Sequence, residues 1–260
     1  IYYSHDDEFG AVTISLVEVA KPFAPHKGEL HLVGSGPGDL EMLTSDSRSA
    51  LTRCAAWLGY TPYLNYLESI RRHDQVRIDS QLTFEKDRCQ HALDLAKEGI
   101  RVALISSGDS GIYGMAGLAL ELWLEESCDS RPLFQVHPGI SAFQMAAAKL
   151  GAPFMHDFCS ISLSDLLTPW NQIEKRIQSA AQGDFVLAIF NPKSIKRDWQ
   201  LKKAVDLLLE FRKPSTPVGI ARQLGRSEES IEIHTLESLP FDQVDMLTIL
   251  VVGNSQSVVK

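Results

Sequence analysis

Cysteine is scarce in this sequence, and Cys54, Cys89, Cys128 and Cys159 never form a C-x-x-C pair. Zinc and iron–sulfur sites usually draw on closely spaced cysteines, so neither kind of site is predicted locally. No H-E-x-x-H sequence and no cluster of carboxylates appears either, and we therefore expect no metal centre. Buried free thiols are the expected state of the four cysteines.

Long apolar runs are also missing, because even the stretch 185–190 is far too short to span a bilayer. The first residues contain neither an Arg-rich transit segment nor a signal-peptide core, which predicts a cytoplasmic protein with no membrane partner. Basic residues are outnumbered, giving a formal net charge of −8. Nucleic-acid binders normally carry a basic surplus, so no nucleic-acid partner is expected.

What the sequence does contain, from Gly28 onward, is a regular alternation of short apolar runs and helical segments. In chain order we expect strands at 29–33, 55–59, 101–105 and 133–137, and helices at 43–55, 83–98 and 112–126. Strands that alternate with helices at this rhythm predict a mostly parallel sheet with helices on both faces.

The second half of the chain has a different pattern. We expect helices at 141–149, 169–182 and 199–211, and strands at 158–163, 185–190, 217–221, 230–235 and 246–252. The last three strands have few helices between them, which indicates a mixed sheet. The fold class predicted is α/β with two unlike α/β domains, residues 28–137 and 138–260, and an active-site cleft between them. Residues 1–27 are expected to be an N-terminal extension or linker.

Glycine-rich turns follow several predicted strands, at Gly34-Ser-Gly-Pro-Gly-Asp39, Ser107-Gly-Asp-Ser-Gly111 and Pro138-Gly-Ile-Ser-Ala142. Open α/β sheets bind ligands at the carboxyl ends of their strands, so these turns are candidate binding loops. The first turn lacks the second half of the dinucleotide fingerprint and its acidic partner, and no G-K-[ST] occurs. An NAD-dependent oxidoreductase and a P-loop ATPase are therefore disfavoured. Asp39 and Asp109 also suit helix N-caps, an alternative that stays open.

Aromatic and basic residues form two further candidate surfaces. Tyr60, Tyr63 and Tyr66 are spaced three apart, which in a helix makes either a core stripe or the wall of a ligand cleft. Arginines and lysines follow two predicted strands and suit either a solvated face or a polyanion site. These basic residues are Lys193, Lys196, Arg197, Arg222 and Arg226, with Arg71 and Arg72 after the aromatic segment. His137, His156 and His234 are isolated and are interpreted as structural.

The turns together make residues 28–256 resemble the tetrapyrrole (corrin/porphyrin) methyltransferases of cobalamin biosynthesis. The opening strand with G-x-G-P-G-D, the G-D-S-G turn and P-G-I-S-A carry this resemblance. The run from His156 to Trp170, Asn191-Pro-Lys-Ser194 and Val252-Gly-Asn-Ser-Gln256 are similar to the precorrin-3B C17-methyltransferase branch. The resemblance implies a homodimeric, S-adenosylmethionine-dependent enzyme that methylates C17 of a corrin precursor, precorrin-3B or its cobalt form, with ring contraction.

The same resemblance implies roles for individual residues. The cofactor-binding set would be Pro37, Ser107, Gly108, Asp109, Ile112, Ser141, Ala142, Asn191, Ala221, Gly253 and Asn254. Asp39 would be the catalytic carboxylate, able to accept or relay a proton near the macrocycle. Lys193, Lys196, Arg197, Arg222 and Arg226 would bind the carboxylates of the substrate.

Two departures from the family pattern bear on this expectation. Ser110 stands where the family has proline, which is expected to loosen the cofactor turn, and Gln223 begins a segment that reads N-A-G-R in the family. Two alternatives stay open: another methylase of this fold, acting at a different precorrin position or on ribosomal RNA, or a tetrapyrrole-binding module without catalysis.

Overall fold

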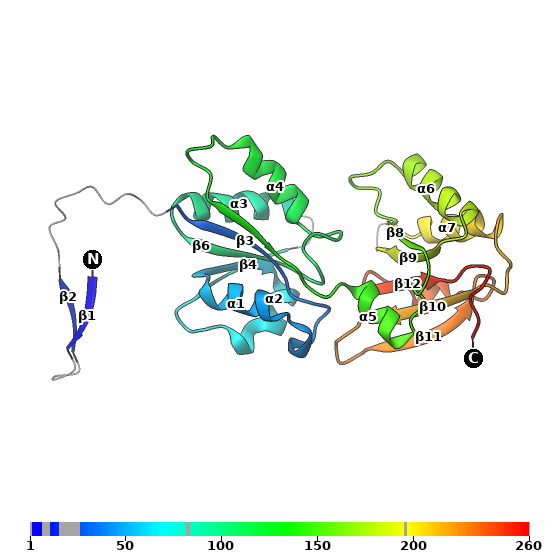
Figure 1. The fold of residues 1–260 in the computed structure, drawn as a ribbon, viewed down its shortest axis with the longest axis horizontal. Helices are drawn as coiled ribbons and strands as arrows, with labels where there is room; N and C mark the ends of the chain where they lie inside the picture. The colour runs from blue at the N-terminus through cyan, green and yellow to red at the C-terminus, as the bar shows by residue number, and fades with distance from the viewer. Residues whose placement is uncertain (1, 7–10, 16–26, 82–83, 195–196, 260) are drawn as a thin grey trace.

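Two α/β halves, each built on a five-stranded sheet, make up the main body of the chain (Figure 1). The computed structural model describes residues 2–6, 11–15, 27–81, 84–194 and 197–259. At the amino terminus, β1 (Tyr2–Asp6) and β2 (Ala11–Ser15) pair as an antiparallel hairpin. The rest of the predicted extension, except Lys27, lies outside the described residues.

The first sheet has the strand order β5-β4-β6-β3-β7, and all of its pairings are parallel. Its elements in chain order are β3 (Glu29–Gly34), η1 (Leu40–Met42), α1 (Ser45–Arg53), β4 (Ala56–Tyr60), α2 (Thr61–Leu67), η2 (Glu68–Ile70), β5 (Val76–Ser80), α3 (Glu85–Lys97), β6 (Arg101–Ser106), α4 (Ala116–Glu125) and β7 (Leu133–His137). Helices α3 and α4 cover one face, and α1 and α2 cover the other (Figure 1).

The strands alternate their side chains between these two faces. Leu30 and Leu32 of β3 belong to the α3–α4 core, whereas Val33 belongs to the core that contains α1 and α2. Both sets are fully buried. This period of two on a strand covered by helices on both sides explains why the strands read as continuous apolar runs.

Two local predictions in this half differ from the structure. Strand β5 was not expected, because at the edge of the sheet its polar sequence Val-Arg-Ile-Asp-Ser is mostly half-buried or exposed. The helix expected from residue 112 begins at Ala116, since Tyr113 adopts a left-handed backbone (φ 53°) in the turn before it. A left-handed residue cannot lie inside a right-handed helix.

The second sheet has the order β11-β10-β12-β9-β8 and is mixed, as predicted. Its elements are α5 (Ala142–Lys149), β8 (Phe158–Ser162), α6 (Trp170–Gln182), β9 (Val186–Phe190), α7 (Gln200–Leu209), β10 (Pro217–Arg222), β11 (Ser230–Thr235), η3 (Phe241–Gln243) and β12 (Thr248–Val252). Strands β8 and β9 pair in parallel, whereas β12 runs antiparallel to both β9 and β10. The carboxyl ends of β8, β9 and β10 therefore lie at the same edge as the amino end of β12.

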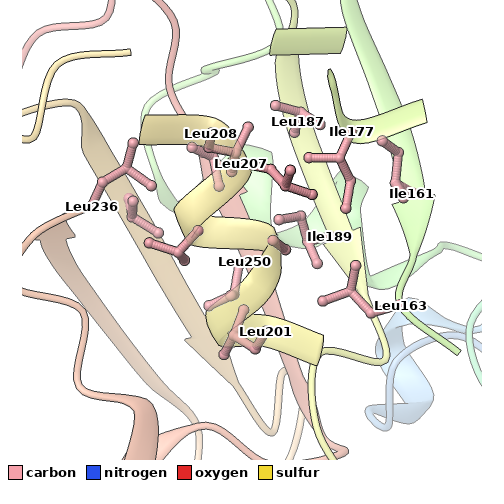
Figure 2. Packing of buried hydrophobic residues seen from close by; sticks show 14 of the residues in the cluster. Ile161, Leu163, Ile177, Leu187, Ile189, Leu201, Leu207, Leu208, Leu236 and Leu250 are labelled. Carbon is pink, nitrogen blue, oxygen red and sulfur yellow. The ribbon is translucent and has the colours of Figure 1, made fainter. Parts of the chain in front are cut away.

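The core of this half lies between the sheet and helices α6 and α7, while α5 covers the opposite face (Figure 1). Leu201 and Leu208 of α7 are fully buried and face the sheet residues Leu187, Ile189 and Leu250 (Figure 2). This packing holds the strands whose ends form the site described below. The predicted fold class, with a parallel sheet in the first half and a mixed sheet in the second, is confirmed. The strands of the two sheets lie on either side of residue 138, although the predicted domain boundaries themselves stay a prediction.

No helix among the described residues combines the length and the apolar character needed to cross a bilayer.

His31 of β3 and His137, the last residue of β7, form a buried contact between these two strands. His31 Nδ1 lies 2.9 Å from His137 Nε2, and the outer nitrogens contact Glu29 at 2.9 Å and Asp46 at 2.7 Å. These contacts join two adjacent strands to the first turn of α1. The predicted structural role of His137 agrees with this arrangement.

The stability of the protein should fall when the pH is lowered below about 6.5. Burial lowers the pKa of His31, and the hydrogen bond to Glu29 opposes this only in part. An unfolded histidine takes up a proton near pH 6.5, whereas native His31 resists protonation until a lower pH, so acid favours the unfolded state. Thermal unfolding measured between pH 7 and pH 5 checks this, with the His31→Gln variant expected to show a shallower decrease. Equal pH dependence in both proteins would contradict the prediction.

Candidate functional site

Three loops that were predicted to share one edge of the first sheet meet in the structure. The backbones of Gly36 and Gly108 exchange two hydrogen bonds, of 3.1 and 2.7 Å. The Asp109 carboxylate accepts from the Gly139 N–H at 3.0 Å, which ties the third loop to the second. The parallel sheet explains this convergence, because β3, β6 and β7 are neighbours and end at the same edge.

The approach between these loops is close enough to require glycine. A Cβ on Gly139 would lie 2.1 Å from the carbonyl oxygen of Gly108, and one on Gly34 would lie 2.6 Å from the Gly139 nitrogen. Neither position can take a side chain without moving backbone. The glycines of the glycine-rich turns therefore allow the three loops to come together.

A pocket of about 160 Å³ opens where these loops face the second sheet. The first half and the connecting segment contribute Pro37, Tyr63, Ser107, Gly108, Ile112, Tyr113, Ser141 and Ala142. The second half contributes Phe190, Asn191, Gln223, Leu224, Arg226, Met246, Leu247, Thr248 and Ile249. The pocket thus depends on both sheets, at the carboxyl ends of β9 and β10 and the amino end of β12.

Seven of the predicted cofactor residues line this pocket: Pro37, Ser107, Gly108, Ile112, Ser141, Ala142 and Asn191. Asn191 is held in a left-handed conformation (φ 50°), and its side-chain amide donates to the Ser162 hydroxyl at 2.9 Å. The ring of Tyr113 lies 4.8 Å from that of Phe190, which brings the two halves into direct contact beside the pocket.

Two other predicted cofactor residues lie just behind the pocket wall. The Asp109 carboxylate accepts from the N–H groups of Gly111 and Gly139 and so joins two of the loops. It is not the helix cap that the alternative interpretation expected, because α4 begins only at Ala116 and its N-cap is Met115. Ala221 is fully buried on β10, where it packs with Leu224 and Ile249. Both residues support the lining without belonging to it.

The structure places Gly253 and Asn254 away from the pocket, contrary to the expectation for them. They follow β12, whose other end lines the pocket. The Asn254 amide donates to the carbonyl of Asp184, just before β9, at 3.0 Å, whereas Asn191 follows the far end of β9. Because β12 is antiparallel to β9, its carboxyl end is at the opposite edge of the sheet.

Asp39 is both a cap and a surface residue of the site. Its carboxylate accepts from the Glu41 N–H at 2.9 Å and caps the short helix Leu40–Met42. It also lines a small hollow that adjoins the pocket and shares Pro37, Tyr63, Ser107 and Arg226 with it. The side chain is exposed, so the cap does not prevent it from facing a bound molecule.

The structure does not gather the predicted basic residues into one patch. Of those described, only Arg226 lines the pocket. Lys193 donates to the carbonyl of Phe241 at 3.2 Å, and Arg222 contacts the carboxylate of Asp245 at 3.4 Å. Lys196 lies outside the described residues.

Arg197 has a structural role, because it is buried and donates to the Asn191 carbonyl at 3.1 Å. Burial lowers the pKa of its guanidinium, although the charge of Asp165 partly compensates. The sequence placed it among substrate-binding groups because burial cannot be read from a charged residue in a loop. Its contact holds the loop that carries Asn191.

The aromatic segment contributes residues that the sequence did not assign to the site. Tyr63 lines both the pocket and the hollow, and Tyr66 lines the hollow. Tyr60 packs edge-on against Tyr63 with ring centroids 5.1 Å apart. Of the two alternatives left open for this stripe, the cleft wall is the one that the structure favours for Tyr63 and Tyr66. The spacing of three was the signal for it.

Both departures from the family pattern make side-chain hydrogen bonds in the structure. Ser110 is fully buried, and its hydroxyl donates to the Leu32 carbonyl of β3 at 3.3 Å. The turn is therefore fastened by a hydrogen bond that proline cannot make. Gln223 lines the pocket and donates to Glu228 at 2.8 Å. Within the described ranges, no three His, Cys, Asp or Glu side chains gather in a way that suits a metal ion.

Residues 29–240 match the sequence model of the Tetrapyrrole (Corrin/Porphyrin) Methylases. The chain is 44% identical over 231 residues to a probable cobalt-factor III C(17)-methyltransferase of Salmonella typhimurium, covering 89% of the chain and 95% of that protein. Several other curated relatives are longer, and the chain spans 43% to 62% of their length.

Solved structures share the fold. The crystal structure of the methyltransferase CobJ superposes with a TM-score of 0.84 at 35% identity, covering 90% of the chain and 97% of CobJ. A uroporphyrin-III C-methyl transferase from Thermus thermophilus, complexed with S-adenyl homocysteine, superposes with a TM-score of 0.67 at 19% identity, covering 87% and 97% of the two chains.

Proposed function

Since the chain belongs to the tetrapyrrole (corrin/porphyrin) methylases, we propose that it transfers a methyl group from S-adenosylmethionine to a corrin precursor. The reaction proposed is methylation at C17 with ring contraction, on precorrin-3B or its cobalt-containing counterpart. The similarity to a probable cobalt-factor III C(17)-methyltransferase over 95% of its length supports this choice of position. The observation that carries the proposal is the pocket between the two sheets, which all three glycine loops border or support.

The residues present fit S-adenosylmethionine, which supplies an electrophilic methyl group when it is bound. Pro37, Ile112 and Ala142 offer apolar surface, while Ser107 and Asn191 offer polar groups. Gly108 (φ 67°) borders the pocket without a side chain, and an added Cβ would lie 3.6 Å from the Ser141 Cα. Backbone groups, small side chains and a few polar residues are the usual lining of a cofactor pocket. We propose that these residues hold the donor and exclude water from it.

The macrocycle would meet the open side of this pocket. Asp39, exposed on the adjoining hollow, is proposed to accept or relay the proton that ring contraction requires. The loop after β8 begins beside Asn191, where the Leu163 N–H donates to the Phe190 carbonyl at 3.0 Å. Leu166 and Leu167 in that loop are 81% and 93% exposed, and we propose that they contact the apolar face of the ring. We also propose a cytoplasmic homodimer, for which the family resemblance is the support.

Methyl transfer tests this proposal directly. The protein is incubated anaerobically with S-adenosylmethionine and either the metal-free or the cobalt-containing precursor, and the products are analysed by mass spectrometry. One added methyl group on one of the two precursors is expected, with no addition when the donor is omitted. Methylation at a position other than C17 would favour another methylase of this fold.

Two binding measurements separate the remaining alternatives. Calorimetry with S-adenosylhomocysteine is expected to show binding, whereas a tetrapyrrole carrier without catalysis would bind the ring alone. Titration with ribosomal RNA at low salt is expected to show no binding, because the chain carries a net charge of −8. Tight RNA binding would instead favour an RNA methylase.

A further inference from the structure

Arg226 is a cation without an anionic partner within the part of the chain that the structure describes. Its guanidinium carbon lies 5.1 Å from the centre of the Tyr66 ring, a cation–π contact, and its buried Nε has no hydrogen-bond partner among the described residues. Its side chain borders both the pocket and the small hollow. A partly buried guanidinium that lacks hydrogen bonds is costly unless a ligand supplies the acceptor.

Tyr63 places a second donor at the same junction. Its side chain borders both cavities, and in the described ranges its hydroxyl makes no hydrogen bond. Burial raises the pKa of this phenol, although the charge of Arg226 partly opposes the shift. The hydroxyl is therefore protonated at neutral pH and can donate. Tyr63 is half-buried, and its hydroxyl offers a donor to a molecule bound at this junction.

The backbone around Arg226 holds it in position before any ligand arrives. A Cβ on Gly38 would lie 2.8 Å from the Arg226 Cγ, so the glycine backbone packs directly on the arginine stem. The preceding residue, Gly225 (φ 71°), donates its N–H to Glu229 at 2.7 Å, and Glu229 pairs with Lys149 at 2.5 Å. The loop that carries Arg226 is thus tied both to the glycine loop after β3 and to α5.

We propose that the Tyr63 hydroxyl and the Arg226 guanidinium form a carboxylate-binding subsite where the pocket meets the hollow. An ionised carboxylate accepts from both donors, and arginine gives the planar fork that matches it. Among the described residues Asp39 forms no ion pair with Arg226, and its carboxylate caps the helix Leu40–Met42 instead. The subsite rests on the proposed function, which offers two carboxylate sources: the amino-acid portion of the methyl donor and the side chains of the ring.

The experiment uses calorimetry on the whole protein with three probes. S-adenosylhomocysteine carries the donor's carboxylate, and 5′-methylthioadenosine has the same adenosine and thioether but lacks the amino acid. Uroporphyrin serves as a tetrapyrrole that carries carboxylates on its periphery. The variants are Arg226→Gln, which removes the positive charge, and Tyr63→Phe, which removes only the hydroxyl. The matched control is Arg131→Gln, since Arg131 also lies over an aromatic ring, 4.7 Å from the centre of Trp123, but outside the pocket lining.

If the donor's carboxylate occupies the subsite, Arg226→Gln weakens S-adenosylhomocysteine binding by about 10- to 100-fold. Methylthioadenosine affinity is then unchanged. If a carboxylate of the ring occupies it, the same loss appears for uroporphyrin, and S-adenosylhomocysteine binds as before. In either case Tyr63→Phe gives a smaller loss toward the same probe, and Arg131→Gln gives none.

The subsite is overturned if wild-type protein binds S-adenosylhomocysteine and uroporphyrin and both variants bind them equally well. Wild-type protein that binds neither probe would overturn the proposed function, and the subsite with it. Thermal unfolding of each variant shows whether a lost affinity reflects a lost fold. Should Arg226→Gln unfold, Tyr63→Phe and Arg226→Lys take its place, the latter keeping the charge but losing the planar fork.

Discussion

Replacing Asp39 with asparagine is expected to lower the rate of methyl transfer by about 100-fold or more, with little change in thermal stability. The expectation follows from its two roles. As a helix cap, Asp39 needs only an oxygen that accepts from the Glu41 N–H at 2.9 Å, and asparagine supplies one equally well. As a proton acceptor at the hollow it needs a carboxylate, which asparagine lacks. Turnover by mass spectrometry and the melting temperature are measured on the same protein.

The Asp39→Ala variant separates these two roles. It removes cap and carboxylate together, so it should lose activity as the asparagine variant does and also lose about 1 kcal/mol of stability. If Asp39→Asn keeps wild-type turnover while Asp39→Ala loses stability, Asp39 is a cap only, and the proposed proton acceptor lies elsewhere.

Replacing Gly139 with alanine is expected to destabilise the fold by about 2–4 kcal/mol and to weaken S-adenosylhomocysteine binding by about 10-fold or more. The added Cβ would lie 2.1 Å from the Gly108 carbonyl oxygen and 2.7 Å from the Gly34 carbonyl carbon. Both contacting atoms belong to the backbone, so the loops must move apart, and with them the pocket lining at Gly108 and Ser141. Chemical denaturation and calorimetry report the two effects separately.

Gly117 provides the matched control for this substitution. It lies exposed in α4, where an added Cβ would meet nothing within 4 Å. Alanine at this helical position should stabilise the protein by about 0.5–1 kcal/mol and leave binding unchanged. Equal behaviour of Gly139→Ala and Gly117→Ala would show that the loops do not need the close approach that the structure indicates.

Much of the architecture was predictable because its signals are local. Apolar runs followed by glycine turns predicted β3 and β6, and the change from alternating helices to successive strands predicted the mixed second sheet. The edge strand β5 was not predicted, because a half-exposed strand that contains Arg77 and Asp79 has no apolar run to mark it. Its pairing with β4, rather than its own composition, makes it a strand.

In the candidate site, too, some residues were predictable from local sequence signals and others were not. Pro37, Ser107, Gly108, Ser141 and Asn191 lie in turns that directly follow strands, and the structure brings them to one pocket. Tyr63 and Arg226 lie on separate elements, and only the packing of the two halves places both at the junction of pocket and hollow.

By itself, the sequence determined most of the strands, helices and glycine turns, because backbone preference and apolar period act over a few neighbouring residues. It also determined the family, through those turns. Tertiary structure alone decided the direction of β12, which carries Gly253 and Asn254 to the far edge of the sheet, and the burial that makes Arg197 a structural residue. Strand direction and the burial of a charge depend on partners distant in the chain, and no local pattern records them.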